Sequence, residues 1–339
     1  MRAISVDTAE LTADRAVGLV AASDVRGEAG EAILRKGQVV TTGDVERLRR
    51  GRQTIHLIAP DPTDLHQDEA GRRLSAAIAG PGLEVKGPTA GQYSLVAREA
   101  GLLKVDAETL LRLNCVPNVA IFTLFDDQYV PVGEEVGAAK VVQLVVAASD
   151  LEQVETIVRE RGAPLSVKPI LSRRVGVLVR ERLKPKPRAR FQHAIQGKLA
   201  WFRSEIDLEE IAETDGDSLR ALSGQIERGA AVVLIAGGAW GDPLDPAFVA
   251  LERLGGQLER VGLPAEPGTL FWLGYVGEVA VIGLPMCALL AEAGIVDLIV
   301  AKLLAGEHVT NRELAGYGHG GLLKRYMSYR FPPFGHGDG

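Results

Sequence analysis

The chain has 339 residues, of which 46% are hydrophobic and 24% charged, and its formal net charge is −6. This composition is typical of a globular protein of two or three domains, and the negative charge gives no overall attraction to nucleic acid or to a membrane. Because no basic, apolar leader follows Met1 and no apolar run approaches about twenty residues, we expect a cytoplasmic protein that binds neither.

The two cysteines, Cys115 and Cys287, lie 172 residues apart. This separation matches neither a disulfide framework nor the close spacing of zinc ligands. We therefore expect Cys115 to be a small buried residue. The six histidines show no ligand spacing either, so no metal-ligating residues are predicted.

The first 150 residues mix short apolar runs with turn residues. Residues 55–58 have the pattern of a strand, and residues 64–79 have the spacing of a helix that ends at a Gly-Pro-Gly turn. Short strands separated by glycines follow. We predict an α+β region over residues 1–150, with up to two sub-lobes, and then a linker helix and strand over residues 151–170.

From Val175 onward the pattern becomes regular. We predict strands over residues 175–179, 231–236 and 276–284, and helices over residues 189–203, 245–254 and 288–304. Strands that alternate with helices imply right-handed crossovers and a largely parallel sheet covered by helices on both faces. The fold class is therefore α/β, with one domain over residues 171–306 and a C-terminal extension and mobile tail over residues 307–339.

A glycine loop follows the apolar run 231–236, which has the composition of a central strand. Asp245 and Pro246 then open a helical pattern, and Asp245 is suited to cap free amides of that helix. This order places unpaired backbone N–H groups at the carboxyl end of a sheet, where α/β proteins bind phosphorylated ligands. The loop lacks the glycine spacing of dinucleotide sites and the Gly-Lys-Ser/Thr of nucleotide P-loops.

Side chains in this loop have two interpretations each. Trp240 could stack on a planar ring or pack in a core or interface. Asp242 and Asp245 could contact nitrogens of a heterocycle, although the cap is the expected role of Asp245. A second loop, residues 283–288, also lies between a strand and a helix, so the two loops could form two walls of one cleft. No base partner for Cys287 is visible there.

Residues 171–204 contain ten Lys/Arg and one acidic residue. Such a concentration is unusual in a chain that is acidic overall. Part of it follows the first predicted strand and faces the same sheet edge as the glycine loop, where Arg180, Arg182 or Lys184 could balance a phosphate. The alternative is a solvated basic loop stiffened by two prolines.

The order of these loops resembles the molybdopterin-binding fold of molybdenum insertases and molybdopterin adenylyltransferases. That family has Gly-Gly-x-Ser-x-Gly-Asp, a Pro-Gly loop and Gly-Leu-Pro-Gly-Asn-Pro, and residues 237–242, 266–268 and 283–285 stand in the corresponding order. A closer likeness is to bacterial molybdopterin-binding proteins, often fused to a cytidylyltransferase-like domain, whose last loop reads Gly-x-Pro-x-Cys-Ala, as residues 283–288 do. The likeness covers most of the chain.

The resemblance implies a protein that binds molybdopterin or molybdenum cofactor, with Mg²⁺ as an optional addition. It would act as a carrier or accessory factor in cofactor biosynthesis or molybdoenzyme maturation, as a homo-oligomer, with a molybdoenzyme or cytidylyltransferase as partner. The residues that would bind the pterin phosphate are Gly237, Gly238, Ala239, Trp240, Gly241, Asp242, Asp245, Gly283, Pro285, Met286, Cys287, Arg180 and Arg182.

Departures from the family motifs keep two alternatives open. Arg180-Glu181-Arg182 stands where the insertases have Thr-Gly-Asp-Glu, and the glycine loop lacks their serine. The first alternative is a divergent insertase or nucleotidyltransferase that uses Mg²⁺, for which Glu181, Asp242 and Asp245 are the nearest carboxylates. The second is a non-catalytic oligomeric interaction module whose cleft is empty.

Overall fold

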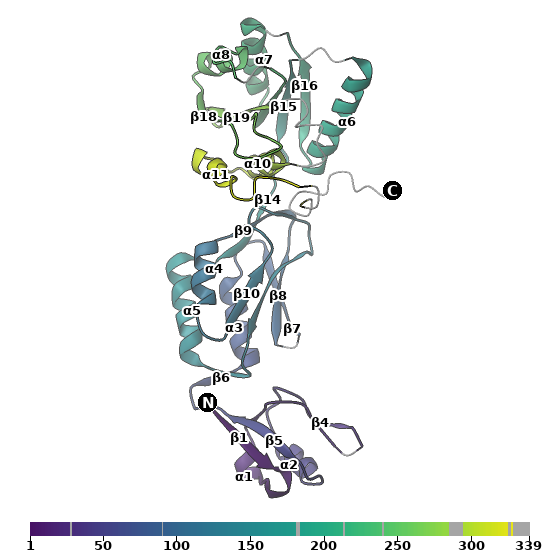
Figure 1. The fold of residues 1–339 in the computed structure, drawn as a ribbon, viewed down its shortest axis with the longest axis vertical. Helices are drawn as coiled ribbons and strands as arrows, with labels where there is room; N and C mark the ends of the chain where they lie inside the picture. Colours follow the sequence, from purple (N-terminus) through teal and green to yellow (C-terminus); the bar gives the residue numbers. More distant parts are fainter. Residues whose placement is uncertain are drawn as a thin grey trace. The chain divides into compact units, whose positions relative to one another are not determined.

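The structure is a computed structural model, and it describes residues 1–27, 29–89, 91–180, 184–212, 214–238, 241–284, 294–324 and 327. Helices and strands are interspersed along the chain (Figure 1). By its internal contacts the chain divides into two compact units. Unit 1 comprises Met1–Glu99, Lys104–Asp126 and Pro131–Val167. Unit 2 comprises Ala100–Leu103, Asp127–Val130 and Lys168–Gly339.

The N-terminal part of unit 1 is built on a small antiparallel sheet with strand order β1-β5-β2. Its elements are β1 (Arg2–Asp7), η1 (Thr8–Glu10), α1 (Ala13–Ala16), β2 (Val20–Ala21), β3 (Val25–Arg26), β4 (Ala32–Leu34), α2 (Thr42–Leu48) and β5 (Thr54–Ala59). Helix α2 begins in a capping box between Thr41 and Asp44, which supplies partners for its first amides. Leu34, Leu48 and Leu57 form the centre of a separate apolar core.

The remainder of unit 1 contains a four-stranded antiparallel sheet of order β10-β12-β8-β7. Its strands are β7 (Leu83–Thr89), β8 (Gln92–Ala97), β10 (Val119–Thr123) and β12 (Glu135–Val141). The other elements here are β6 (Asp64–His66), α3 (Gln67–Ile78), α4 (Ala107–Asn114), β13 (Val145–Ala147) and α5 (Ala148–Arg161). A further sheet of order β11-β9-β14 is not confined to unit 1: it consists of β9 (Gly101–Val105), β11 (Tyr129–Val130) and β14 (Leu165–Pro169), and β11 belongs to unit 2.

Two local predictions for this region need correction. The helix expected over residues 64–79 starts at Gln67, because residues 64–66 pair with β13 as strand β6. Cys115 is exposed rather than buried. It lies at the C-cap of α4, just outside the helical turns whose Thr109 and Leu113 face inward.

Unit 2 is built on a six-stranded sheet of order β16-β15-β17-β20-β19-β18. Its strands are β15 (Arg174–Val179), β16 (Glu205–Glu210), β17 (Val232–Ala236), β18 (Gln257–Val261), β19 (Trp272–Val276) and β20 (Val279–Leu284). The first four strands in this order are parallel to one another. Strands β19 and β18 continue the sheet in antiparallel pairing.

The expectation of a largely parallel sheet therefore needs correction: it holds for β16, β15, β17 and β20, but β19 and β18 pair antiparallel, and the sheets of the described chain are mostly antiparallel. The strand predicted over residues 276–284 is instead the end of β19 and all of β20, joined through Gly277 and Glu278. Gly277 has a positive φ of 56°. A connection of two residues closes a hairpin, whereas a parallel neighbour needs a crossover of about a dozen residues.

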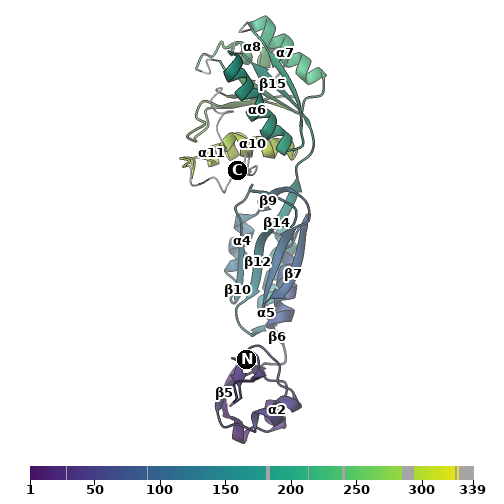
Figure 2. The same ribbon diagram turned by 90° about the vertical axis from the view of Figure 1, so that its right-hand side faces the viewer.

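Helices cover both faces of the six-stranded sheet, as Figures 1 and 2 show. Helices α6 (Pro185–Trp201) and α10 (Ile295–Leu304) pack on one face, through side chains such as Phe191 and Ile299. Helices α7 (Asp215–Glu227) and α8 (Pro246–Arg253) pack on the other, through side chains such as Leu222 and Leu251. Helix α11 (Asn311–Gly316) follows α10.

The prediction of a helix at residues 245–254 is confirmed by α8. Strand β16 was not predicted, because its sequence, Glu-Ile-Asp-Leu-Glu-Glu, is acidic and it lies at the edge of the sheet. The C-terminal extension and mobile tail predicted over residues 307–339 is tested in part: α11 forms within it and its Leu314 is buried in the core, whereas residues 328–339 lie outside the described residues. In the described ranges, no helix has the length and apolar character needed to cross a bilayer.

Candidate functional site

Three parallel strands of unit 2 end side by side. In the sheet register Val179 pairs with Ala236, and Ala236 pairs with Leu284. The amide of Gly237 then donates a hydrogen bond of 3.1 Å to the carbonyl of Leu284. The loop after β17 and the loop after β20 therefore start in direct contact.

The Pro-Gly loop lies at the same edge. Val261 at the end of β18 pairs with Trp272 at the start of β19, and Trp272 pairs with Gly283. The residues between these two strands, which include Pro267 and Gly268, thus connect them at the edge where β20 ends. The strand ends from which all three loops start therefore lie at one edge of the sheet.

The backbone of the first loop requires glycine. Gly237 has a φ of 86° and Gly238 a φ of 117°, and these values lie in the region that side chains strongly disfavour. The turn directs the chain away from β17 within two residues. Ala239 and Trp240 lie outside the described residues, so their expected contacts with a ligand stay predictions.

Asp242 and Asp245 organise the return of the loop to α8. The carboxylate of Asp242, which is exposed, accepts a hydrogen bond of 2.9 Å from the amide of Leu244. The buried carboxylate of Asp245 accepts one of 2.9 Å from the amide of Ala247. Asp245 is therefore the N-cap of α8, as the sequence predicts, with Pro246 in the first helical position.

Arg180 lies directly after β15 and is buried together with Asp245. The guanidinium Nη1 lies 2.5 Å from Oδ1 of Asp245, and each side chain is only 2% exposed. Two buried charges are tolerated when each satisfies the other. This ion pair connects the end of β15 to the start of α8.

The exposed cations at this edge belong to α6 instead. Lys184 precedes the helix, Pro185 takes its first position, and Lys186 and Arg190 project into solvent. Arg188 is paired with Glu210 at the end of β16, at 2.6 Å. The two prolines read as a stiff loop are thus part of the first helical turn, where proline is favoured because that amide needs no partner.

Gly283 has a packing role. A Cβ at this position would overlap the indole ring of Trp272 on the neighbouring strand. Trp272 is fully buried against α8, so the strand needs a residue without a side chain here. The remaining predicted residues of the second loop, Pro285, Met286 and Cys287, lie in the gap 285–293, and Arg182 lies in the gap 181–183.

A pocket of about 450 Å³ opens beside the glycine loop. Gly241 and Phe248 line it from the loop and α8, and Leu258 and Val261 line it from β18. Leu244, Leu258 and Val261 are exposed apolar side chains. The sequence does not indicate this pocket, because apolar and polar residues alternate only weakly in β18 and the strand was not predicted. In the ranges that the structure describes, no group of three His, Cys, Asp or Glu could hold a metal.

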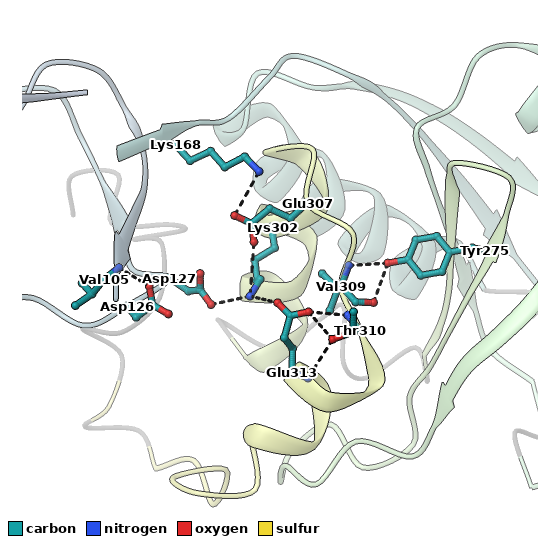
Figure 3. Close-up of polar contacts among 10 residues, drawn as sticks. All are labelled: Val105, Asp126, Asp127, Lys168, Tyr275, Lys302, Glu307, Val309, Thr310 and Glu313. Carbon is teal, nitrogen blue, oxygen red and sulfur yellow. Dashed lines mark hydrogen bonds and ion pairs between the residues drawn. The ribbon is translucent and has the colours of Figure 1, made fainter. Parts of the chain in front are cut away.

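A second cluster of charges in unit 2 is buried on α10 (Figure 3). The ammonium of Lys302 lies 2.8 Å from a carboxylate oxygen of Asp127, 3.1 Å from Glu313 and 3.7 Å from Glu307. Burial disfavours its charged form, but Tyr317, Asp127 and Glu313 outweigh that cost and raise the pKa of Lys302. The cluster fastens the segment Asp127–Val130 to the helix.

The pKa values of Glu313 and Tyr275 are also shifted in this region. Burial opposes ionisation of Glu313, but hydrogen bonds from Thr310 and Lys302 prevail and lower its pKa to about 2. The hydroxyl of Tyr275 donates to the carbonyl of Val309 at 3.0 Å and accepts from its amide at 2.9 Å (Figure 3). Burial raises the pKa of Tyr275 to about 12.

Lys198, another of the basic residues in 171–204, also forms an ion pair inside the fold. Its ammonium lies 3.0 Å from both carboxylate oxygens of Asp297, and both residues are buried between α6 and α10. Burial raises the pKa of Asp297, although Lys198 opposes the shift. The basic stretch therefore divides into buried residues that hold helices and exposed residues at the start of α6.

Comparisons with known proteins identify no family. No family model matches the chain, and no curated protein matches it either. Among solved structures, the chain is similar to the crystal structure of the molybdopterin biosynthesis MoeA protein from Pyrococcus horikosii. The identity is 16%, the match covers 92% of this chain and 76% of that chain, and the TM-score is 0.31. A score of this size does not establish a shared fold.

Proposed function

We propose that unit 2 binds molybdopterin or the molybdenum cofactor at the edge of the sheet where β15, β17 and β20 end. The protein would serve as a carrier or accessory factor in cofactor biosynthesis or molybdoenzyme maturation. The observation that carries the proposal is the contact between the Gly237 amide and the Leu284 carbonyl. Through it, the two loops that resemble pterin-binding motifs begin next to each other.

The ligand phosphate would lie on the glycine loop. A loop with two glycines in left-handed conformations can turn successive amides toward one anion. Helix α8 starts directly after this loop, and the N-terminus of a helix favours negative charge. Lys184 and Lys186 are exposed at the start of the helix that follows β15. Neither forms an ion pair with a described residue, so both can approach a phosphate.

Arg180 would support the site without contacting the ligand. Its charge is shared with Asp245, so we assign it the role of holding the loop after β15 against α8. The ring of the pterin would lie near Trp240, Asp242 and Met286, as the resemblance implies. Mg²⁺, if it takes part, would arrive with the phosphate, with Asp242 as the exposed carboxylate.

Calorimetric titration of the purified chain with molybdopterin tests the proposal. We expect micromolar binding or tighter. Reversing two charges in Lys184→Glu with Lys186→Glu should weaken it about tenfold or more, or about 1.4 kcal/mol. The matched control, Arg253→Glu with Arg312→Glu, makes the same charge change at exposed positions of unit 2 and should stay within about twofold. Absence of heat with intact, folded protein contradicts the proposal.

A second candidate function is an interaction module. The exposed side chains of Leu244, Leu258 and Val261 gather at one pocket beside β18, the edge strand of the sheet. Edge strands and exposed apolar patches are common contact surfaces. Light scattering should detect a homo-oligomer that Leu258→Asp converts to monomer, with or without pterin.

The enzymatic alternative predicts turnover of pterin with ATP or CTP and Mg²⁺.

A further inference from the structure

We propose that the N-terminal part of unit 1 binds a small anion that carries several phosphates, in a cavity lined by arginines. The cavity has a volume of about 620 Å³ and lies between the β3–β4 hairpin and the chain that follows α2. The charged and amide side chains at its wall are Arg26, Arg47, Arg50, Arg52, Glu31 and Gln53. This site is independent of the pterin proposal, which concerns unit 2.

Among the described residues, the arginines of the cavity wall carry more positive charge than the nearby carboxylates neutralise. Four of the six residues 47–52 are arginines, in a chain whose net charge is −6. Arg47 forms an ion pair with Asp44, and Arg26 donates a 3.0 Å hydrogen bond to a backbone carbonyl of its own hairpin. Arg50 and Arg52 have no ion-pair partner within the described residues.

The backbone around these arginines is held in place before any ligand arrives. The buried hydroxyl of Thr8 donates to the carbonyl of Gly51 at 2.8 Å and accepts from the amide of Gln53 at 3.1 Å. The amide of Thr8 donates to the carbonyl of Gln53 at 3.0 Å. The side chain of Gln53 then reaches the carbonyl of Arg26 at 3.0 Å. Both walls of the cavity are joined through Gln53, which lowers the cost of ordering the site.

The end of α2 does not oppose an anion here. The last carbonyls of a helix carry partial negative charge when they lack partners. In this helix the amide of Arg50 bonds to the carbonyl of Arg47 at 3.3 Å, and that of Gly51 bonds to the carbonyl of Leu48 at 3.2 Å. These carbonyls are thus directed into the turn, and the guanidinium groups set the charge of the cavity.

The chemistry of the wall selects the ligand class. Guanidinium groups match the geometry of phosphate and can bind it through two parallel hydrogen bonds. The cavity volume falls in the range of small-molecule sites, about 300–1,000 Å³. The described residues of its lining include no aromatic side chain, whereas proteins that bind single-stranded nucleic acid stack bases on aromatic rings. A compact oligophosphate fits these properties better than a nucleic acid strand.

Titration of the full chain with inorganic triphosphate, at constant ionic strength, tests the proposal. We expect saturable binding with one site per chain. Arg50→Glu with Arg52→Glu should weaken it at least about tenfold. The matched control is Arg35→Glu with Arg49→Glu, which reverses the same number of charges at exposed positions outside the cavity wall. It should change binding by less than about threefold.

Three results would overturn the proposal. They are no binding of triphosphate to the intact chain, equal weakening by the two double variants, and tighter Arg50-dependent binding of single-stranded RNA than of triphosphate. The neutral variant Arg50→Gln with Arg52→Gln guards against misfolding as an explanation. Its melting curve should match that of the intact chain, and its affinity should lie between those of the intact chain and the charge-reversed variant.

Discussion

Unit 2 uses its charged side chains in two different ways. On α10, Lys302 is buried among three carboxylates, and Arg180 is buried against Asp245. At the start of α6, Lys184 and Lys186 remain in solvent. Residue type alone does not separate these roles, because sequence reasoning grouped Arg180 with the ligand-binding cations. A charged side chain that is buried with a partner stabilises the fold, whereas an exposed one is accessible to a ligand.

Removing Arg180 should give the largest effect on stability. Arg180→Met removes the ion-pair partner of the buried Asp245, and breaking a buried ion pair from one side costs about 3–5 kcal/mol. Adding Asp245→Asn removes the buried charge and keeps an N-cap residue, so the double variant should recover most of the loss. Urea denaturation measures both. A double variant as unstable as the single one would show that Arg180 and Asp245 do not stabilise the fold through each other. Burial with a partner would then not distinguish structural charges from exposed ones.

Tyr275→Phe should come next. The variant leaves the amide and carbonyl of Val309 without the hydroxyl that now serves both, and a buried polar group that loses its partner costs about 1–3 kcal/mol. Tyr129→Phe, also in unit 2, removes a hydroxyl for which the described chain shows no hydrogen bond, and it should cost less than about 0.5 kcal/mol. Thermal unfolding of the two variants provides the comparison.

Acid should weaken the Lys302 cluster through Glu313. The pKa of Glu313 is lowered in the fold to about 2, so its contribution is complete above its unfolded pKa of about 4.3 and is lost as the pH falls toward 2. Because Glu313 is 40% exposed, screening reduces the effect to about 1 kcal/mol. Denaturation between pH 6 and pH 3 should show a smaller loss of stability in Glu313→Gln. An unchanged pH dependence would argue against this carboxylate as a partner of Lys302.

The smallest effect is expected at the exposed cations. Lys186→Ala should change the free energy of unfolding by no more than about 0.5 kcal/mol. The direction should be toward higher stability, because a positive charge in the first turn of α6 opposes the helix dipole. Chemical denaturation checks this value. A loss above 1 kcal/mol would mean that Lys186 supports the fold after all.

Local sequence pattern predicted the parts of unit 2 that depend on neighbours along the chain. The apolar run of β17, the glycine turn after it and the Asp245 cap of α8 all follow from adjacent residues. Strands β18 and β19 did not, because their pairing depends on a hairpin and an edge position rather than on composition.

The sites depend more strongly on distant residues. Arg180 and Asp245 are 65 positions apart, and no spacing rule links them. The arginine cavity of unit 1 needs Arg26 from one hairpin and Arg52 from beyond α2. The run of arginines at 47–52 is a signal that could have been noticed in the sequence, but its opposite wall is visible only in three dimensions.

The interleaved path of the backbone has a practical consequence. Because unit 2 includes Ala100–Leu103 and Asp127–Val130, a peptide starting at Lys168 would lack Leu102, which belongs to its apolar core. It would also lack Asp127, leaving Lys302 with one fewer counterion. A protease that nicks the chain once at residue 168 should therefore leave the two halves associated. Truncation at that point should yield an insoluble or molten product rather than an independent module.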